Sequence, residues 1–211
     1  MKRSLMGLDS GPDKNTILLL HFDGNIVDAT EKVNVTINSG SAAYTQGKFG
    51  QCLNAKLPVL HASGLSANLG LSDFTLDFWL KKTGTANNYE GIFDTKYYTQ
   101  SGGICFQHSY YHNTIQFYYT GSSTASTLDV TVEQGVWTHI AVVRKDGVTS
   151  IYKNGILQGT NNVNPNLSIT DAYIFQRYNQ NIPLTTALVD ELRFSNVARW
   201  TSNFNVPTKP Y

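Results

Sequence analysis

The sequence predicts an all-β fold, a jelly-roll sandwich of two antiparallel sheets. Short apolar runs alternate with turn-forming residues along the whole chain, and no segment has the 3.6-residue period of a helix. Two dipeptides of the tight-hairpin type, Asp146-Gly147 and Asn154-Gly155, each follow such a run. Regularly spaced short strands of this kind pack as two face-to-face sheets with jelly-roll connections.

Composition narrows the class of protein. The 211 residues suit one large sandwich, and a hydrophobic content of 41% is enough for its core. Charged residues make up only 15% and the net charge is +1, with scattered Lys and Arg, so we expect no nucleic-acid binding. No stretch approaches the roughly 20 apolar residues of a membrane helix, so we expect no membrane insertion. The N-terminus has basic residues without a following apolar run, which is not a signal peptide.

The N-terminal residues divide into a polar segment and the start of a folded domain. Residues 1–15 contain a Gly-Pro pair and few apolar residues, and we expect an arm or attachment segment there. Residues 16–211 then form a single jelly-roll domain. In its first third, strands are expected at 16–22, 33–37 and 47–53, and a loop with leucines that reach the core at 58–71.

The middle of the chain has the clearest alternation. Phe74, Leu76, Phe78 and Leu80 share one face of an expected strand at residues 74–81. Polar loops, the second of them rich in Tyr, are expected on either side of a short strand that opens at Ile92. The loops are residues 84–91 and 96–103, and further strands are expected at 104–107, 114–119 and 127–132.

Residues 137–144 are apolar on both faces, so this strand is expected to be covered on both sides. His139 should therefore be a hydrogen-bonded core residue, whereas Arg144, beside a turn, should be solvated. The remaining strands are expected at residues 150–153, 169–176 and 188–194, and in a jelly roll the first and last strands can pair.

Three blocks of the sequence resemble the laminin G-like jelly roll of the concanavalin A-like lectin and glucanase superfamily. The first, residues 137–155, is a Trp-x-His, an apolar run, a basic residue, a turn and an aromatic strand that ends in Asn-Gly. The second is FTLDFWL at 74–80, and the third is LVDELRF at 188–194. The resemblance extends from Ile17 to the C-terminus and implies the same sandwich.

The tail at residues 197–207, VARWTSNFNVP, is similar to the ending of laminin G-like domains in bacteriophage virion proteins. This resemblance implies a non-enzymatic protein displayed on the virion surface as a tail, fibre or head-decoration component. Adhesion or glycan binding at the host surface is its expected role, and a homotrimer is one expected assembly. A purely structural decoration subunit, whose loops contact neighbouring virion subunits, remains an alternative. So does a secreted bacterial carbohydrate-binding module.

A metal site is expected where the first and last strands meet. Asp190 is in phase with Leu188 and Leu192, and a buried carboxylate is costly unless it is paired, hydrogen-bonded or metal-bound. Asp23 and Asn25 follow the first strand, and oxygen ligands of this kind suit Ca²⁺. The family resemblance implies a structural calcium at Asp23 and Asp190, with Asn25 as a third candidate ligand. The alternative is an Asp190 that accepts loop amide hydrogen bonds without an ion.

Tyrosine-rich loops provide the candidate carbohydrate site. A tyrosine ring packs on the C–H face of a sugar while its hydroxyl hydrogen-bonds, although the same residues also build protein–protein contacts. The candidate carbohydrate-binding residues are Tyr97, Tyr98, Tyr110, Tyr111, Tyr178 and Asn179. Tyr89 lies in the same set of loops. Further polar partners there are Asn87, Asn88, Gln107, His108, His112, Asn113, Arg177 and Gln180.

Catalysis is not expected. Glycoside hydrolases need two carboxylates that flank the scissile bond, and those of this superfamily carry them on one strand in an E-x-D-x-x-E pattern, which the sequence lacks. Asp190 and Glu191 are adjacent in sequence and point to opposite faces of a strand. Cys52 and Cys105 are expected to be buried, reduced thiols.

Overall fold

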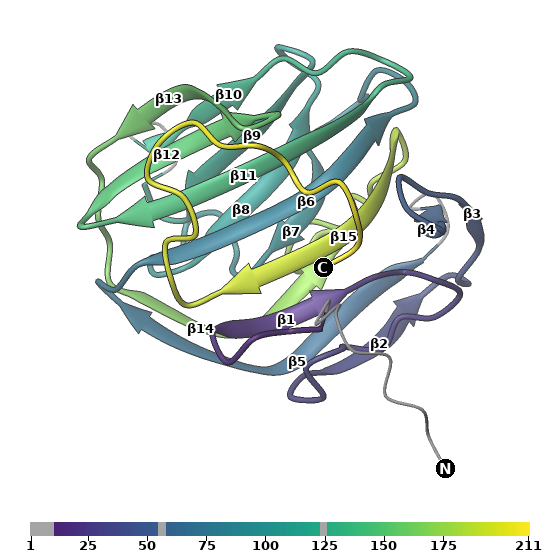
Figure 1. Cartoon of the computed structure of the whole chain (residues 1–211), viewed down its shortest axis with the longest axis horizontal. Coiled ribbons are helices and arrows are strands. Elements are labelled where there is room, and N and C mark those ends of the chain that lie inside the picture. The colour runs from purple at the N-terminus through teal and green to yellow at the C-terminus, as the bar shows by residue number, and fades with distance from the viewer. Residues whose placement is uncertain (1–10, 55–57, 123–125) are drawn as a thin grey trace.

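The computed structural model describes residues 11–54, 58–122 and 126–211, so the first ten residues of the expected arm lie outside the described part. The described residues form fifteen strands in two antiparallel sheets (Figure 1). The predicted all-β, two-sheet sandwich is therefore confirmed.

The first sheet is built around β15, the last strand of the chain. One side of β15 pairs with β6, and its other side is shared end to end by β4 and β1. The first and last strands are therefore neighbours, as predicted. The strand order is β13 (Ile156–Asn161), β12 (Val148–Lys153), β11 (Trp137–Lys145), β6 (Phe74–Lys82), β15 (Ala187–Ser195), β4 (Gln51–Asn54) and β3 (Tyr44–Gln46), with β1 (Thr16–Leu20) beside β15.

The second sheet carries the strands from the middle of the chain. Its centre is formed by β7, β8 and β14, and its long flank is the pair β14 and β5. The strand order is β10 (Leu128–Val130), β9 (Thr114–Tyr119), β8 (Ile104–Ser109), β7 (Glu90–Asp94), β14 (Leu167–Ile174), β5 (Val59–Gly70) and β2 (Asn34–Ser39).

The core lies between the two inner faces. Phe74, Leu76, Phe78 and Leu80 of β6 are all buried in it, which confirms the alternation read from the sequence. Phe78 meets Phe106 of the opposite sheet edge-to-face at 5.1 Å. Each such ring contributes about 1.5–3 kcal/mol through the apolar surface it removes from water.

Both expected hairpin turns are confirmed. Asp146 and Gly147 have φ angles of 49° and 81°, and Asn154 and Gly155 have 49° and 77°. Positive φ at both central residues defines the type I′ turn, whose twist matches that of the flanking strands. The second turn leads into β13, an edge strand whose side chains are mostly exposed. This strand was not predicted because none of its side chains is buried, so its sequence has no alternation of apolar and polar residues.

The N-terminal third contains the other errors of the strand assignment. Residues 58–71 were expected to be a loop, but most of this segment forms β5, the longest strand. Its inward positions are partly alanines, and the alternation changes phase at Gly64, which has a φ of 79°. A bulge of this kind breaks the period-two pattern. Residues 47–50 form a turn rather than the start of a strand, and β3 was not predicted at all.

Arg144 was expected to be solvated, and this is wrong. Its side chain is fully buried and donates hydrogen bonds to the carbonyl oxygens of Gly70, Ser72 and Pro165. A guanidinium has five donors and can be buried where loop carbonyls satisfy them. Arg144 therefore ties two loops to the end of β11.

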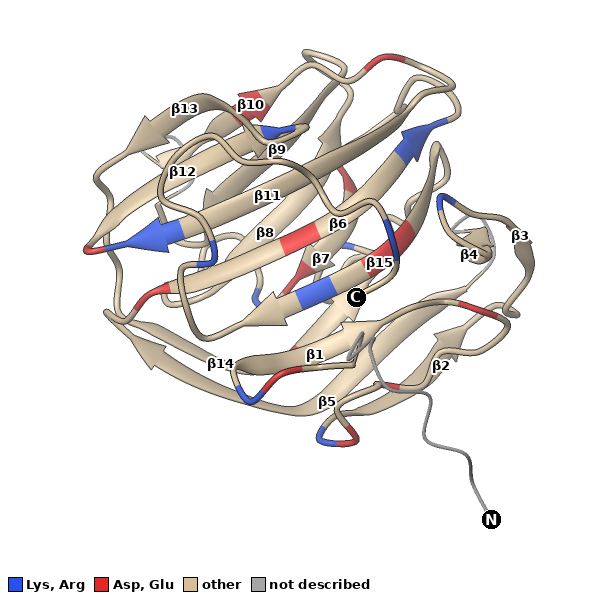
Figure 2. Cartoon of the chain, in the orientation of Figure 1, with Lys and Arg blue, Asp and Glu red and all other residues tan. Residues whose placement is uncertain are grey.

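Several other features agree with the sequence. Cys52 and Cys105 are free and buried, as predicted, and burial raises the pKa of Cys52 to about 12. Charged residues are dispersed over strands and loops (Figure 2). Within residues 11–54, 58–122 and 126–211, no helix has the length and apolarity needed to span a bilayer.

Candidate functional site

The outer face of the first sheet is covered by the C-terminal tail. Residues 196–211 run back across this sheet in front of β6, β11 and β12 (Figure 1). Trp200 and Phe204 stack with ring centroids 3.9 Å apart and pack with Ala141, Val143 and Tyr152. Trp200 therefore packs the tail onto the domain, and the tail leaves no room for a ligand at the centre of this face.

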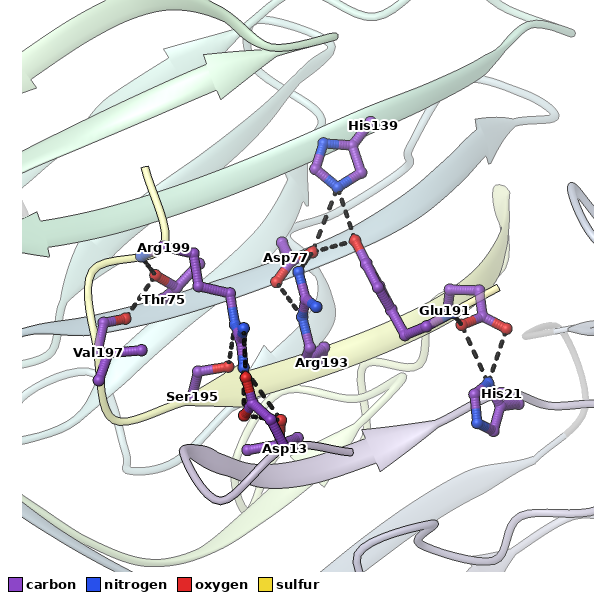
Figure 3. Close-up of polar contacts among 12 residues, drawn as sticks. Asp13, His21, Thr75, Asp77, His139, Glu191, Arg193, Ser195, Val197 and Arg199 are labelled. Atoms are coloured by element: carbon purple, nitrogen blue, oxygen red, sulfur yellow. Dashed lines mark hydrogen bonds and ion pairs between the residues drawn. The ribbon is translucent and has the colours of Figure 1, made fainter. Parts of the chain in front are cut away.

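A buried polar cluster lies beneath the tail (Figure 3). Asp77 of β6 accepts two hydrogen bonds of 3.1 Å from Arg193 and one from the hydroxyl of Tyr211, and its carboxylate lies 3.3 Å from Nε2 of His139. Burial alone would raise the pKa of Asp77, but the charge of Arg193 and the contact with His139 outweigh it and lower the pKa to about 2. His139 is thus a buried, hydrogen-bonded residue, as predicted.

The root of the tail is fixed to the N-terminal segment. Arg199 donates hydrogen bonds to the carboxylate of Asp13 at 3.0 and 3.1 Å, and these bonds lower the pKa of that carboxyl below its usual range. Thr75 donates to the carbonyl of Val197 at 2.7 Å and accepts the N–H of Arg199 at 2.9 Å (Figure 3). The described end of the expected arm therefore docks on the domain.

The expected calcium ligands Asp23 and Asp190 meet at one turn. Oδ2 of Asp190 accepts the N–H groups of Lys48 and Phe49 at 2.7 and 3.0 Å, and Oδ1 of Asp23 accepts that of Gln51 at 2.6 Å. The other oxygen of Asp190 is buried and has no hydrogen-bond partner among the described residues. Burial raises the pKa of Asp190 to about 7.

The third candidate ligand, Asn25, makes hydrogen bonds within its own loop. Its amide oxygen accepts the N–H of Val27 at 2.9 Å, and its amide nitrogen donates to the carbonyl of Asp23 at 3.2 Å. Across residues 11–54, 58–122 and 126–211, no group of three or more His, Cys, Asp and Glu side chains is placed to hold a metal. A cation at this turn would use the unpaired oxygen of Asp190, a carboxylate oxygen of Asp23, backbone carbonyls and water.

The outer face of the second sheet carries a pocket of about 400 Å³. Phe106 of β8 and Phe117 of β9 point into the core, so the residues adjacent to them in sequence point outward. Those that line the pocket are Gln107 on β8 and Gln116 and Tyr118 on β9. Loops before β7, before β8 and after β14 form the walls. The lining residues are Asn88, Tyr89, Tyr98, Gln107, Gln116, Tyr118, Thr127, Arg177, Gln180 and Ile182.

The floor of the pocket is a continuous hydrogen-bond chain. Arg177 donates to the amide oxygen of Gln107 at 2.5 Å, and the Gln107 amide nitrogen donates to Gln116 at 2.5 Å. Gln116 in turn donates to Asp129 at 3.0 Å. Gln107 and Arg177 are only 2% and 5% exposed, so packing as well as hydrogen bonding fixes their side chains.

Arg177 makes two further side-chain hydrogen bonds, to Asp94 and Tyr118. Its Nε donates to Asp94 at 2.9 Å and its Nη2 to the hydroxyl of Tyr118 at 2.7 Å. Burial raises the pKa of Asp94, and the charge of Arg177 and the N–H of Tyr178 oppose that rise. The cation and the carboxylate are thus paired beneath the floor.

Exposed tyrosines stand beside the pocket. Tyr98 lines it, and Tyr97 packs against Tyr98 with ring centroids 4.7 Å apart. On another wall, Tyr89 contacts Tyr110 at 5.0 Å, and Tyr110 contacts Tyr111 at 6.3 Å. The structure therefore brings Tyr97, Tyr98 and Tyr110 to the pocket or next to its lining, and Tyr111 lies one ring further out, against Tyr110.

The other two candidates belong to the loop after β14, between the lining residues Arg177 and Gln180. Tyr178 packs edge-to-face on Tyr173 of β14 at 5.2 Å, and Asn179 occupies a turn with a φ of 49°. Neither lines the pocket. Gln116 and Tyr118 do line it and were not singled out from the sequence, although strand alternation at residues 114–119 places them opposite the core.

The fold and the sequence agree on a family. The family model described as the concanavalin A-like lectin/glucanases superfamily matches residues 59–202, which is more than half of the chain. The chain belongs to this superfamily. No curated protein matches it in sequence.

Solved structures with the same fold include one domain of an arabinanase and the binding domains of two toxins. Domain 4 of a GH43 extracellular arabinanase from Geobacillus stearothermophilus, in complex with arabinotriose, is 18% identical with a TM-score of 0.70, and the match covers 87% of this chain and 93% of that one. The binding domain of Paraclostridial Mosquitocidal Protein 1 is 13% identical (TM-score 0.69; coverage 87% and 49%). The receptor-binding domain of botulinum neurotoxin type G is 15% identical (0.66; 88% and 48%). The chain thus spans about half the length of these toxin domains.

Proposed function

We propose that the chain is a carbohydrate-binding domain whose binding site is the pocket over β8 and β9. The observation that carries the proposal is a fixed polar floor flanked by exposed tyrosines. Gln107 and Gln116 supply amide donors and acceptors, while Tyr98 is 44% exposed and presents its ring at the edge. Saccharide sites combine these two elements, because sugar hydroxyls need polar partners and sugar C–H faces pack on aromatic rings.

Two solved structures of the same fold support this proposal. One is a domain of an arabinanase in complex with arabinotriose, and another is the receptor-binding domain of botulinum neurotoxin type G. At identities of 13–18% these similarities establish the fold. The argument for binding by this chain therefore depends on its own pocket.

A binding role without catalysis is part of the proposal. Glycoside hydrolysis uses two carboxylates that flank the bond, and the lining side chains in the described part of the pocket include neither Asp nor Glu. Asp129, at the end of the floor, already accepts hydrogen bonds from Thr114 and Gln116. We therefore propose that the ligand is held and not cleaved.

The biological setting proposed here is the surface of a phage particle, where the domain would attach to host glycans. A second candidate role is a structural subunit, favoured by the exposed aromatic rings near the pocket. Tyr97, Tyr110 and Tyr111 are 36%, 46% and 71% exposed, and contacts with neighbouring subunits, such as those of a homotrimer, would bury such rings. A secreted module is the third candidate setting.

A glycan-array screen, with the solution mass recorded in parallel, distinguishes these roles. Carbohydrate binding by a monomer or small oligomer supports the proposal. A stable oligomer that binds nothing on the array, with the tyrosines protected in the assembly, would instead support the structural subunit.

We also propose a structural calcium at the turn held by Asp23 and Asp190. Bound there, the ion would neutralise two neighbouring carboxylates and cross-link the first and last strands to residues 47–51. The unpaired, buried oxygen of Asp190 supports this. Added Ca²⁺ should raise the melting temperature of the wild type and leave that of Asp190→Asn unchanged. Equal melting temperatures with calcium and with chelator would contradict the proposal.

A further inference from the structure

The charges around the pocket define which class of saccharide it can accept. Arg177 is the one charged residue among its described lining residues. Each of its three nitrogens already donates a hydrogen bond, to Asp94, Gln107 and Tyr118. Recognition of a carboxylate or sulfate uses a guanidinium fork or an ammonium that can turn toward the ligand. The bonds from its three nitrogens and an exposure of only 5% hold this guanidinium in place, so it cannot turn to form a fork with a ligand.

The neighbouring carboxylates balance the positive charges of Arg177 and Lys96. Asp94 compensates Arg177 from beneath, and Asp129 adds a second carboxylate at the far end of the floor. Lys96, in the loop that carries Tyr98, donates its Nζ to the carbonyl of Ser101. An anionic ligand would therefore lose hydration without a guanidinium fork to replace it, and it would approach the carboxylate of Asp129.

The floor suits neutral hydroxyl groups. Gln107 and Gln116 are directly opposite each other on β8 and β9, and their amides are joined in one direction, from Arg177 toward Asp129. A primary amide has two N–H donors and an oxygen with two lone pairs, so each retains donor and acceptor capacity after its bonds in the chain. Two adjacent sugar hydroxyls, which both donate and accept, match such a pair.

Gln180 provides an independent indication. It lines the pocket, and its amide nitrogen is buried without a hydrogen-bond partner among the described residues. A buried, unsatisfied donor is costly and gains stability when a ligand oxygen reaches it. A hydroxyl or ring oxygen of a saccharide provides that acceptor.

From these observations we infer that the pocket binds neutral saccharides and discriminates against acidic ones such as uronates and sialosides. This inference rests on the proposed function of the same pocket. Its basis is the pairing of Arg177 with Asp94 together with the one-directional amide chain formed by Gln107 and Gln116.

The test uses an array of neutral hexose and pentose oligosaccharides together with their acidic counterparts. Examples of matched pairs are galacto-oligosaccharides with oligogalacturonides, and lactose with 3′-sialyllactose. The wild type should bind a neutral member at least 10-fold more tightly than its acidic partner. A preference for the acidic members would overturn the inference and leave the proposed carbohydrate-binding function intact. No binding to any member would overturn both.

Two variants locate the origin of the discrimination. Asp129→Asn, at an exposed position, removes the carboxylate at the end of the floor and should narrow the gap between neutral and acidic partners. Asp146→Asn removes an exposed carboxylate in a distant turn and should leave the gap unchanged. An equal effect of both variants, or none from Asp129→Asn, would show that the floor does not set the preference.

Discussion

Replacement of Asp77 by asparagine removes the charge at the centre of the cluster beneath the tail. Asp77 is fully buried, and its two oxygens accept hydrogen bonds from Nε and Nη2 of Arg193 and from the hydroxyl of Tyr211. The asparagine side chain has nearly the same shape but only one acceptor oxygen and no charge. Arg193, whose side chain is 11% exposed, would then lack its counter-ion.

The expected loss of stability follows from two estimates. The pKa of Asp77 is lowered from 3.8 to about 2, and at about 1.4 kcal/mol per pKa unit its ionisation contributes on the order of 2 kcal/mol at neutral pH. Removal of one partner from a buried ion pair costs about 3–5 kcal/mol in other proteins. Asp77→Asn should therefore lower the free energy of unfolding by about 2–5 kcal/mol.

Urea denaturation at pH 7 measures this difference as a shift of the transition midpoint at constant slope. The matched control is Asp13→Asn, which removes another Asp–Arg pair whose carboxylate side chain is 51% exposed. An exposed pair contributes about 0–1 kcal/mol. If both substitutions cost the same, or if Asp77→Asn costs less than about 1 kcal/mol, the buried cluster does not stabilise the fold as argued.

Three further predictions concern the turns, the pH dependence and the thiols. Gly155→Ala should destabilise the protein more than Gly64→Ala. Both glycines have a φ near 80°, but a Cβ added at Gly155 collides with the carbonyl of Phe204, whereas one added at Gly64 meets nothing within 4 Å. Equal melting temperatures of the two variants would contradict tail docking at this turn. Folding lowers the pKa of Asp77, so its contribution to the free energy of unfolding is present above pH 3.8 and is lost as the pH falls through about 2. The wild type should therefore lose more stability than Asp77→Asn between these pH values, and parallel stability curves for the two proteins would contradict this. Both cysteines should react with a thiol reagent only after unfolding, and rapid labelling of the native protein would show that they are not buried.

The parts of the fold that were predictable are those in which local chemistry and burial coincide. The alternation at β6 and the two type I′ turns follow from side-chain spacing and from glycine, and both are confirmed. The edge strand β13 exposes its side chains, and β5 changes phase at Gly64, so neither has a clear period. Arg144 was misjudged because its burial depends on carbonyl groups from distant loops.

The candidate site was predictable to a similar extent. The tyrosine-rich loops indicated Tyr98 and its neighbours, because exposed loop tyrosines can contact a ligand or a partner protein where the scaffold brings them together. Tyr178 has the same composition around it, yet the end of β14 directs it toward Tyr173. The floor residues Gln116 and Tyr118 belong to an alternating strand, and only the pairing of β8 with β9 places them beside Gln107. Side-chain direction and strand pairing therefore decide membership of the site.

The most direct test of the account is the affinity of the tightest-binding array saccharide for three proteins: the wild type, Tyr98→Ala and Tyr178→Ala. Tyr98 lines the pocket, whereas Tyr178 belongs to the loop after β14 but packs on Tyr173 and does not line the pocket. Isothermal titration should show at least a 10-fold loss of affinity for Tyr98→Ala, with Tyr178→Ala within about twofold of the wild type, since each 1.4 kcal/mol of lost contact is about tenfold in Kd. Unchanged binding by Tyr98→Ala, or an equal loss in both variants, would contradict the assignment of this pocket as the carbohydrate site.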